Sequence, residues 1–242
     1  MHLFSDSIDS SPVTFDSEEV LGEFGGKELF TPYVNYLLAE NQKINLVSRE
    51  TSPADLYRMI ADCLIPLKTD ELTDMLKVGA KLSLLDIASG GGLPGIPLAL
   101  ALRSVGIEPY LTLVERTGKK ARFLNRALNQ LGLSGQVIAE DFQTSVNSGP
   151  LKAMTGSFDL VCLRWVKPDS KLVSVIISAL KPTGRFVYYA ALPPGVSDQT
   201  DRSVRLRRLH RLRRLFRLLS TFSYKLSGDE RESRTLTILS QP

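Results

Sequence analysis

The stretch Leu84-Leu85-Asp86-Ile87-Ala88-Ser89-Gly90-Gly91-Gly92-Leu93-Pro94-Gly95 decides the fold. It joins an apolar run, Leu82–Ile87, to a glycine-rich turn and then to Pro94–Val105, a segment typical of a helix opened by proline. Glycines let the backbone turn tightly and approach a ligand without a Cβ in the way. In doubly wound folds, ligands bind at the carboxyl ends of the strands. The stretch therefore predicts a buried strand, a ligand-binding turn and a helix.

Strands and helices alternate after this turn. Such alternation favours a mostly parallel sheet covered by helices on both faces, which is an α/β, Rossmann-like fold. The predicted strands are Tyr110–Val114, Gln136–Ala139, Phe158–Leu163 and Arg185–Ala190, the predicted helices are Lys119–Leu131 and Ser170–Leu180, and Lys181–Gly184 is a predicted turn. Near the end of the chain, Thr221–Leu226 and Arg234–Leu239 are expected to form a closing hairpin.

The residues before the sheet predict an N-terminal helical cap over residues 21–80. Apolar residues recur at helical spacing within Lys27–Asn41, and Ser52 before Pro53 marks the start of a second helix that ends at Leu67. The apolar positions of the first helix are Phe30, Tyr33, Val34, Leu37 and Leu38. Residues 1–20, rich in Ser and Asp, are expected to be a flexible tail, and residues 81–242 the Rossmann-like domain.

Composition argues against several classes of protein. The two cysteines, Cys63 and Cys162, stand in no metal-ligand spacing, so neither a disulfide framework nor a metal site is expected. The amino terminus lacks the charged and apolar regions of a signal peptide, and no apolar run approaches the ~18 residues of a transmembrane helix. We expect a monomeric, cytoplasmic protein with no membrane partner.

Positive charge is concentrated near the carboxyl end. The net charge is +4, and eight arginines with no acid lie within residues 202–217, so the rest of the chain carries −4. On a helix, Arg207, Arg211 and Arg214 share one face and leucines the other, which predicts a last helix, through Leu219, that contacts RNA phosphate. The alternatives are a solvated face with extended arginines, or contact with an acidic membrane surface.

Glu115 ends the predicted strand that follows the glycine-rich turn, 20 residues after Gly95. A carboxylate at this position can accept hydrogen bonds from both ribose hydroxyls of an adenosine-containing ligand. Because the run Ala88–Gly95 is not a full G-x-G-x-x-G pattern, these residues leave a nicotinamide cofactor and S-adenosylmethionine both open. A tight turn with no ligand is the remaining alternative.

The run Asp86–Leu98 resembles the signature of the small-subunit ribosomal RNA guanine-N7 methyltransferase G family, also called glucose-inhibited division protein B. Further blocks fit this family in the same order over about residues 30–190: they are Asn41–Val47, Arg58 with Asp62, Thr117–Leu124, and Leu163 with Arg164. The resemblance implies a class I methyltransferase that uses S-adenosylmethionine. The chain departs from the family pattern at Ala88 for glycine, Met59 for histidine, Cys63 for serine, Trp165 for a small residue and Ala190 for lysine.

The resemblance also implies a set of site residues. Glu115 would hold the ribose, and Arg164 would lie beside the methyl donor and the target base as the catalytic residue. Backbone contacts to the methionine part are implied for Ala88, Gly90, Gly92 and Leu93, and contacts to the adenine for Asp141, Phe142 and Gln143. The implied substrate-binding residues are Asn45, Arg58 and Asp62.

Two neighbouring residues each allow two interpretations. Arg164 either orients the guanine by donating toward O6 or phosphate, or is a surface ion pair at a strand end. Trp165 either stacks on a flipped base or packs in the core.

Guanine N7 carries a lone pair and no proton. Its methylation therefore needs no strong base, and proximity and orientation supply much of the catalysis.

The function expected from the resemblance is methyl transfer from S-adenosylmethionine to N7 of a guanosine in 16S ribosomal RNA of the small ribosomal subunit. One alternative is a methyltransferase of the same fold that acts on another substrate, favoured by Met59 and Ala190. The other is a non-catalytic RNA-binding protein of ribosome assembly, favoured by Ala88 and the arginine segment.

Overall fold

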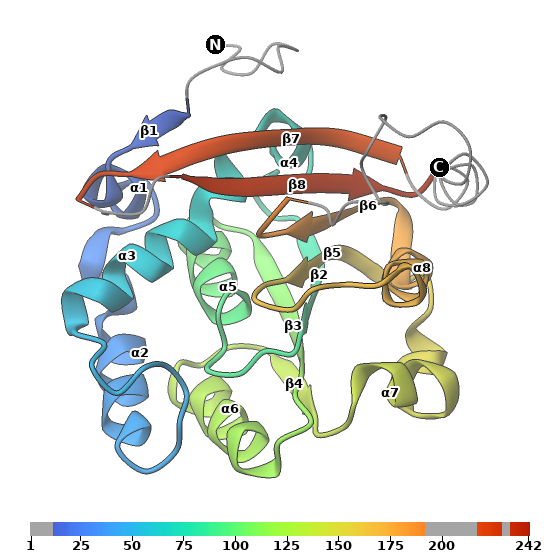
Figure 1. Cartoon of the computed structure of the whole chain (residues 1–242), viewed down its shortest axis with the longest axis horizontal. Helices are drawn as coiled ribbons and strands as arrows, with labels where there is room; N and C mark the ends of the chain where they lie inside the picture. The colour runs from blue at the N-terminus through green and yellow to red at the C-terminus, as the bar shows by residue number, and fades with distance from the viewer. Residues whose placement is uncertain (1–11, 192–216, 229–232) are drawn as a thin grey trace.

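The computed structural model describes residues 12–191, 217–228 and 233–242. These residues build one twisted eight-stranded sheet with helices on both faces (Figure 1). The strand order is β1-β7-β8-β6-β5-β2-β3-β4. The predicted α/β, Rossmann-like fold class is therefore confirmed.

Five strands form the parallel centre of the sheet. They are β2 (Lys81–Ile87), β3 (Glu108–Val114), β4 (Gly135–Ile138), β5 (Phe158–Leu163) and β6 (Leu180–Tyr188). They pair with one another in parallel, with β3 and β4 on one side of β2 and with β5 and β6 on the other, and β6 pairs antiparallel with β8. The strand order thus reverses next to β2, and such switch points are where open α/β sheets bind ligands.

The predicted turn at Lys181–Gly184 is wrong, because β6 runs through these residues. The pairing of β5 with β6 shifts in register between Phe158 and Leu160, so the extra residues are absorbed as an irregularity in the strand. Gly184 lies so close to the backbone of β5 that a Cβ atom would stand 2.7 Å from the Phe158 carbonyl oxygen. The Pro-Thr-Gly sequence that predicted a turn instead serves this close approach.

Helices cover the sheet on both faces because neighbouring strand residues point to opposite sides. In β2, Leu84 packs in one apolar cluster and Leu85 in the other. The first cluster contains α5 (Gly95–Ser104) and α6 (Gly118–Gln130), and the second contains α7 (Phe142–Ser148) and α8 (Ser170–Ala179). The core thus consists of two apolar layers, one on each face of the sheet.

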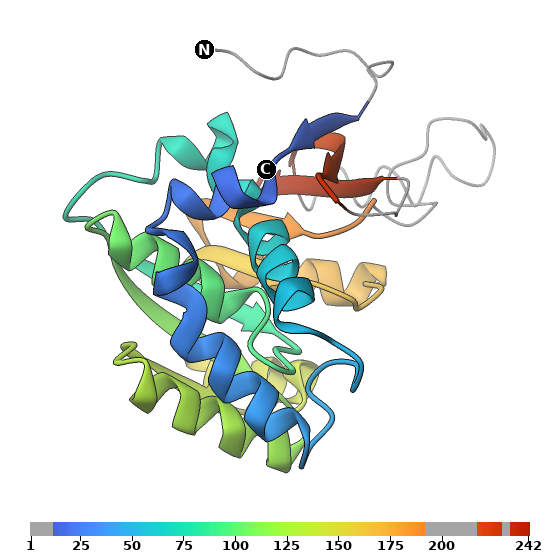
Figure 2. The same ribbon diagram turned by 90° about the vertical axis from the view of Figure 1, so that its left-hand side faces the viewer.

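The N-terminal helices lie over the first of these layers (Figure 2). They are α1 (Ser17–Gly22), α2 (Gly26–Asn41), α3 (Pro53–Leu64) and α4 (Asp70–Thr73), with a 3-10 turn at Ile65–Lys68 between the last two. The predicted start of α3 is confirmed, because Ser52 and Asp55 form a reciprocal capping box. Phe30, Tyr33 and Leu37 of α2 are buried in the same cluster as α5 and α6, so the cap shares the core of the sheet.

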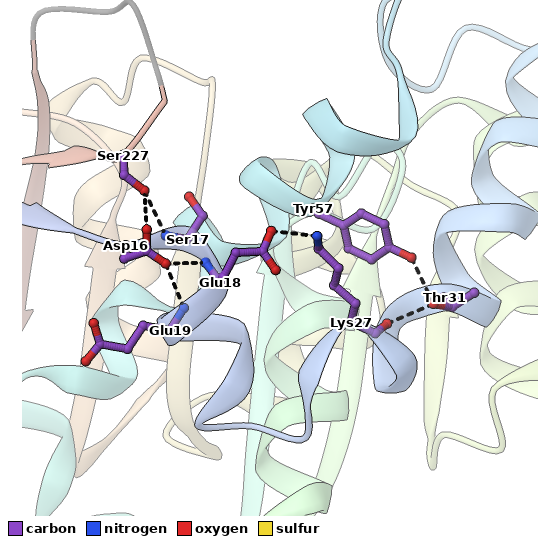
Figure 3. Close-up of polar contacts among 8 residues, drawn as sticks. All are labelled: Asp16, Ser17, Glu18, Glu19, Lys27, Thr31, Tyr57 and Ser227. Carbon is purple, nitrogen blue, oxygen red and sulfur yellow. Dashed lines mark hydrogen bonds and ion pairs between the residues drawn. The ribbon is translucent and has the colours of Figure 1, made fainter.

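Residues 13–20 are ordered structure, whereas the sequence suggested a flexible tail over 1–20; residues 1–11 lie outside the described residues. Strand β1 (Val13–Phe15) pairs in parallel with β7, and α1 follows directly. Figure 3 shows the hydrogen bonds of Asp16 that hold this segment in place. Asp16 Oδ1 accepts from the backbone N–H groups of Glu18 and Glu19, and Asp16 Oδ2 accepts from the Ser227 hydroxyl at 2.7 Å. Pairing of β1 with β7, which lie more than 200 residues apart in sequence, therefore gives this polar N-terminal segment a regular structure.

The predicted closing hairpin is confirmed by β7 (Arg217–Leu226) and β8 (Arg234–Ser240), which pair antiparallel. The predicted arginine helix is wrong at its carboxyl end, because Arg217–Leu219 belong to β7. Antiparallel pairing of β7 with β8 overrides the helical spacing of the leucines there. Arg207, Arg211 and Arg214 lie outside the described residues. In the part of the chain that the structure describes, no helix has the length and hydropathy needed to cross a membrane.

Candidate active site

The predicted cofactor residues follow the carboxyl ends of adjacent parallel strands. Figure 1 shows these strands, β2 to β5, in the centre of the molecule. The loop Ala88–Pro94, here called the glycine loop, follows β2, and Glu115 follows β3. Asp141 follows β4, and Arg164 and Trp165 follow β5. Parallel pairing brings these strand ends together, so positions up to 77 residues apart in sequence share one edge.

The glycine loop contains three left-handed residues, Ala88 (φ 59°), Gly90 (φ 56°) and Gly92 (φ 91°). At Gly90 a Cβ atom would meet nothing nearer than 3.9 Å, so its backbone faces open space. At Gly92 the left-handed backbone favours glycine, and a Cβ there would stand 2.5 Å from Ile96 Cδ1 and displace the end of that side chain. The hydroxyl of buried Tyr33 in α2 donates to the Gly91 carbonyl oxygen at 2.7 Å and so fixes the loop to the N-terminal helices.

Asp86 braces the loop from inside the protein. Its Oδ2 accepts from the Gly95 backbone N–H at 3.0 Å, and a Cβ at Gly95 would stand 2.8 Å from the same oxygen. Its Oδ1 has no hydrogen-bond partner among the described residues. Burial raises the pKa of Asp86 to about 7, although the Gly95 hydrogen bond opposes the shift. The start of α5 is thus pinned to the end of β2 through one buried carboxyl.

Glu115 is buried beside the loop and is oriented by two backbone groups. Oε2 accepts from the Gly90 N–H at 3.0 Å and Oε1 from the Thr117 N–H at 2.7 Å. A carboxylate offers about four acceptor positions, so two remain for ribose hydroxyls. The open space at Gly90 and the fixed carboxylate beside it fit the methionine part and the ribose of S-adenosylmethionine, respectively.

The segment after β4 differs from the loop that the sequence suggested, because α7 begins at Phe142. Asp141 Oδ1 accepts from the Thr144 backbone N–H at 3.3 Å, and the Phe142 side chain is buried in the second apolar cluster. Gln143 lies in the first turn of α7. Their predicted contacts with the adenine stay predictions.

Arg164 is buried, so the interpretation as a surface ion pair is wrong. Its Nη2 lies 2.5 Å from Asp62 Oδ2, and both side chains are 5% exposed. Asp62 Oδ1 accepts from the Tyr224 hydroxyl at 2.7 Å and lies 3.1 Å from Arg234 Nε. These four residues, here called the Asp62 network, join α3, β5, β7 and β8. Arg164 Nη1 has no hydrogen-bond partner among the described residues.

Trp165 is 64% exposed, so the interpretation as a core residue is wrong. The Arg164 guanidinium carbon lies 3.9 Å from the centre of its ring, in a cation–π stack. The backbone of Trp165 is left-handed, with φ at 60°. Such a conformation is an outlier for a bulky side chain and marks a position that the surroundings hold in place.

A cavity of about 750 Å³ lies in front of Trp165. It is lined by residues 46–48, Thr51, Asp55, Arg58, Met59, Trp165, Gly228 and Arg234. Leu46 also touches the glycine loop, because a Cβ at Gly91 would be 3.5 Å from Leu46 Cβ. The cavity therefore adjoins the predicted cofactor residues and receives side chains from α3, β5 and β8.

The structure brings together only part of the predicted substrate-binding set. Arg58 and Trp165 line the cavity, Asp62 lies beneath it in the Asp62 network, and Asn45 is exposed outside the lining. Sequence reasoning missed Tyr224 and Arg234, for which the only signal was their place in the predicted hairpin. The arginines at 207, 211 and 214 lie outside the described residues, so their contact with RNA stays a prediction.

Comparisons with known proteins agree with this geometry. A putative O-methyltransferase from Klebsiella pneumoniae has a similar fold, with a TM-score of 0.55 and 12% identity over 89% of this chain and 94% of that one. The Rossmann-like sheet, the glycine loop and Glu115 define a class I methyltransferase fold with a site for an adenosine-containing ligand.

The family follows from the sequence comparisons. The model of rRNA small subunit methyltransferase G matches residues 26–197. A ribosomal RNA small subunit methyltransferase G from Sorangium cellulosum is 34% identical over 75% of this chain and 68% of its own length. One from Rhodopseudomonas palustris (strain BisA53) is 36% identical over 64% of this chain and 61% of its own. The chain belongs to the rRNA small subunit methyltransferase G family. It spans 68% of the length of the first of these relatives and 61% of the length of the second.

Proposed function

We propose that this methyltransferase transfers a methyl group from S-adenosylmethionine to N7 of a guanosine in 16S ribosomal RNA of the small ribosomal subunit. When bound, S-adenosylmethionine supplies an electrophilic methyl group on its sulfonium sulfur. The backbone of Ala88, Gly90, Gly92 and Leu93 would hold its methionine part, and Glu115 its ribose. The family supports a ribosomal RNA substrate, because its curated relatives carry that substrate in their names.

The cavity beside the glycine loop is the observation that carries the proposal. It offers an exposed aromatic ring, Trp165, and two arginines, Arg58 and Arg234, which suits a nucleotide. Among the described residues of the lining, the one acid is Asp55, whose pKa is lowered by hydrogen bonds from Ser52, so it is a weak base. A target atom that attacks the methyl group with its own lone pair and has no proton to lose, such as guanine N7, matches this lining.

Arg164 would orient the target base in this arrangement. Asp62 holds Nη2, so Nη1 is the group left to donate toward the phosphate of the target nucleotide. Asp62 would then act by positioning Arg164 and would not touch the RNA. Arg58 at the cavity would contact phosphate, where its planar guanidinium is well suited. We further propose that the protein acts as a monomer.

The proposal is tested by transfer of a labelled methyl group from S-adenosylmethionine to small ribosomal subunits that lack N7-methylguanosine. We expect about one methyl group per particle, located by chemical cleavage at a single 16S guanosine. Free 16S RNA serves as the comparison substrate. A protein that binds S-adenosylhomocysteine in calorimetry but labels neither particle nor RNA would act on another substrate. A protein that binds RNA but not the cofactor product would favour the non-catalytic alternative.

A further inference from the structure

We propose that the exposed face of Trp165 is a stacking platform for the purine base of the target nucleotide, and that the Asp62 network holds the ring in place. This inference rests on the proposed function, since it names the mode by which the same cavity recognises its substrate. It concerns a position at which the family resemblance has a small residue, so the platform is a property of this chain.

The first support comes from two features of Trp165, its exposed ring and its left-handed backbone. A large apolar ring that is 64% exposed loses the benefit of burial, and a left-handed tryptophan carries backbone strain. Folding alone favours neither feature. Both are explained if the ring must project from the end of β5 into the cavity, where a ligand covers it.

The second support is the group behind the ring. Arg164 lies 3.9 Å from the ring centre and is almost wholly buried, so it fills one side of Trp165 and leaves the other for a ligand. A cation against one face of an indole polarises the ring, and a purine is a suitable partner for the other face. The ion pair with Asp62, whose Oδ2 lies 2.5 Å from Arg164 Nη2, fixes the position of the guanidinium group.

The third support is the position of the network within the fold. Tyr224 in β7 and Arg234 in β8 both contact Asp62 Oδ1, and both lie outside the residues that the family model matches. Arg234 also lines the cavity, so the terminal hairpin contributes to the cavity wall and to the support of the ring. The strands beyond the matched region therefore complete the platform.

The lining decides which occupant fits. Arg58 and Arg234 place positive charge on the same cavity that Trp165 faces, and Ser48 and Thr51 add hydroxyl groups. This combination suits a base on the ring with its sugar and phosphate toward the arginines. Arg58 pairs with Asp55 and Arg234 with Asp62 within the protein, and a nucleotide phosphate can add contacts to both guanidinium groups, whereas an apolar ligand or a hydrophobic peptide would form none.

Intrinsic fluorescence tests the platform directly, because Trp165 is the single tryptophan of the chain. The probe is guanosine 5′-monophosphate, and ribose 5-phosphate is the control that has the phosphate but no base. We expect saturable quenching of Trp165 emission by the first compound alone. Equal quenching by both compounds, or quenching by neither, would overturn the stacking inference. Arg164→Lys keeps the charge but not the planar stack, and we expect it to weaken the quenching at least several-fold.

Methyl-transfer kinetics provide the second arm. We expect Trp165→Ala to lower kcat/KM for the RNA substrate by about 10- to 100-fold, the range of base-stacking losses, and Trp165→Phe to retain most of it. Affinity for S-adenosylhomocysteine should stay within about twofold in both variants, which shows that they fold. Tyr110→Ala, which removes another exposed aromatic ring at the far end of β3, is the matched control. Unchanged kcat/KM in Trp165→Ala would refute the inference.

The two arms separate the platform from the proposed function. If no methyl group reaches ribosomal RNA but guanosine 5′-monophosphate quenches Trp165, the platform stands and the RNA target is wrong. If transfer to 16S RNA occurs and Trp165→Ala is as active as the natural protein, the function stands and the platform is wrong.

Discussion

The Tyr224 hydroxyl donates a 2.7 Å hydrogen bond to Oδ1 of Asp62, a residue 162 positions earlier in the chain. Asp62 lies in α3 and Tyr224 in β7, and the same carboxylate holds Arg164 through its other oxygen. The bond therefore connects the terminal hairpin to the end of β5. It also places a neutral donor on a buried charge, where a hydrogen bond contributes more to stability than one between neutral groups.

Replacing Tyr224 by Phe should lower the free energy of unfolding by about 1.5 to 3 kcal/mol, because one acceptor of the buried Asp62 carboxylate loses its donor. Equilibrium urea unfolding measures the change. Tyr110→Phe, at an exposed position, is the control and should stay within about 0.5 kcal/mol. If the two variants are equally stable, the Tyr224 bond does not contribute to the Asp62 network.

Replacing Glu115 by Gln should weaken binding of S-adenosylhomocysteine by about 10- to 100-fold, which corresponds to about 1.4 to 2.7 kcal/mol for a charged acceptor of ribose hydroxyls. Calorimetric titration measures the affinity. Glu108→Gln changes the same residue type at the exposed amino end of the same strand and should bind normally. Normal binding by the Glu115 variant would remove this residue from the cofactor site.

Ala88→Gly should stabilise the protein by about 0.5 to 1 kcal/mol. Ala88 has φ at 59°, where an L-residue costs about 1 to 2 kcal/mol, and the greater freedom of glycine in the unfolded chain offsets part of that gain. Ala54→Gly in helix α3 makes the same chemical change in a helical conformation and should destabilise by about 0.5 to 1 kcal/mol. Urea unfolding of both variants measures the contrast, and a loss of stability in Ala88→Gly contradicts the argument.

The buried carboxyl of Asp86 predicts a dependence of stability on pH. Its pKa rises from 3.8 to about 7 on folding, so between these values the folded protein holds a proton that the unfolded chain releases. The stability contributed by the neutral group is full below pH 4 and is lost as the pH rises to about 7. Asp86→Asn removes this titration, so its stability relative to the natural protein should rise by about 2 to 4 kcal/mol from pH 4 to pH 8.

Urea unfolding at several pH values in the absence of ligand measures this difference. Asp74→Asn, at an exposed position, is the control and should follow the natural protein across the range. A constant difference between Asp86→Asn and the natural protein would mean that Asp86 titrates normally when buried.

Much of the sheet was predictable because its signals are local. The run from Leu84 to Gly95 contains a strand, a turn and a helix start within a dozen residues, and β5 was predicted to the residue. The errors arose where distant pairing overrides local pattern. Antiparallel pairing with β8 includes Arg217–Leu219 in β7, and the close approach of Gly184 to β5 includes a turn-like sequence in β6.

The candidate site divides in the same way. Sequence by itself determined the cofactor side, because Asp86, the glycine loop and Glu115 follow strand ends at short spacing and resemble a known family signature. Only the tertiary structure decided the substrate side. Whether Trp165 is core or surface, and whether Arg164 pairs with Asp62, depends on elements that meet across more than 100 residues. Burial and long-range pairing are properties of the packed chain, and no local spacing encodes them.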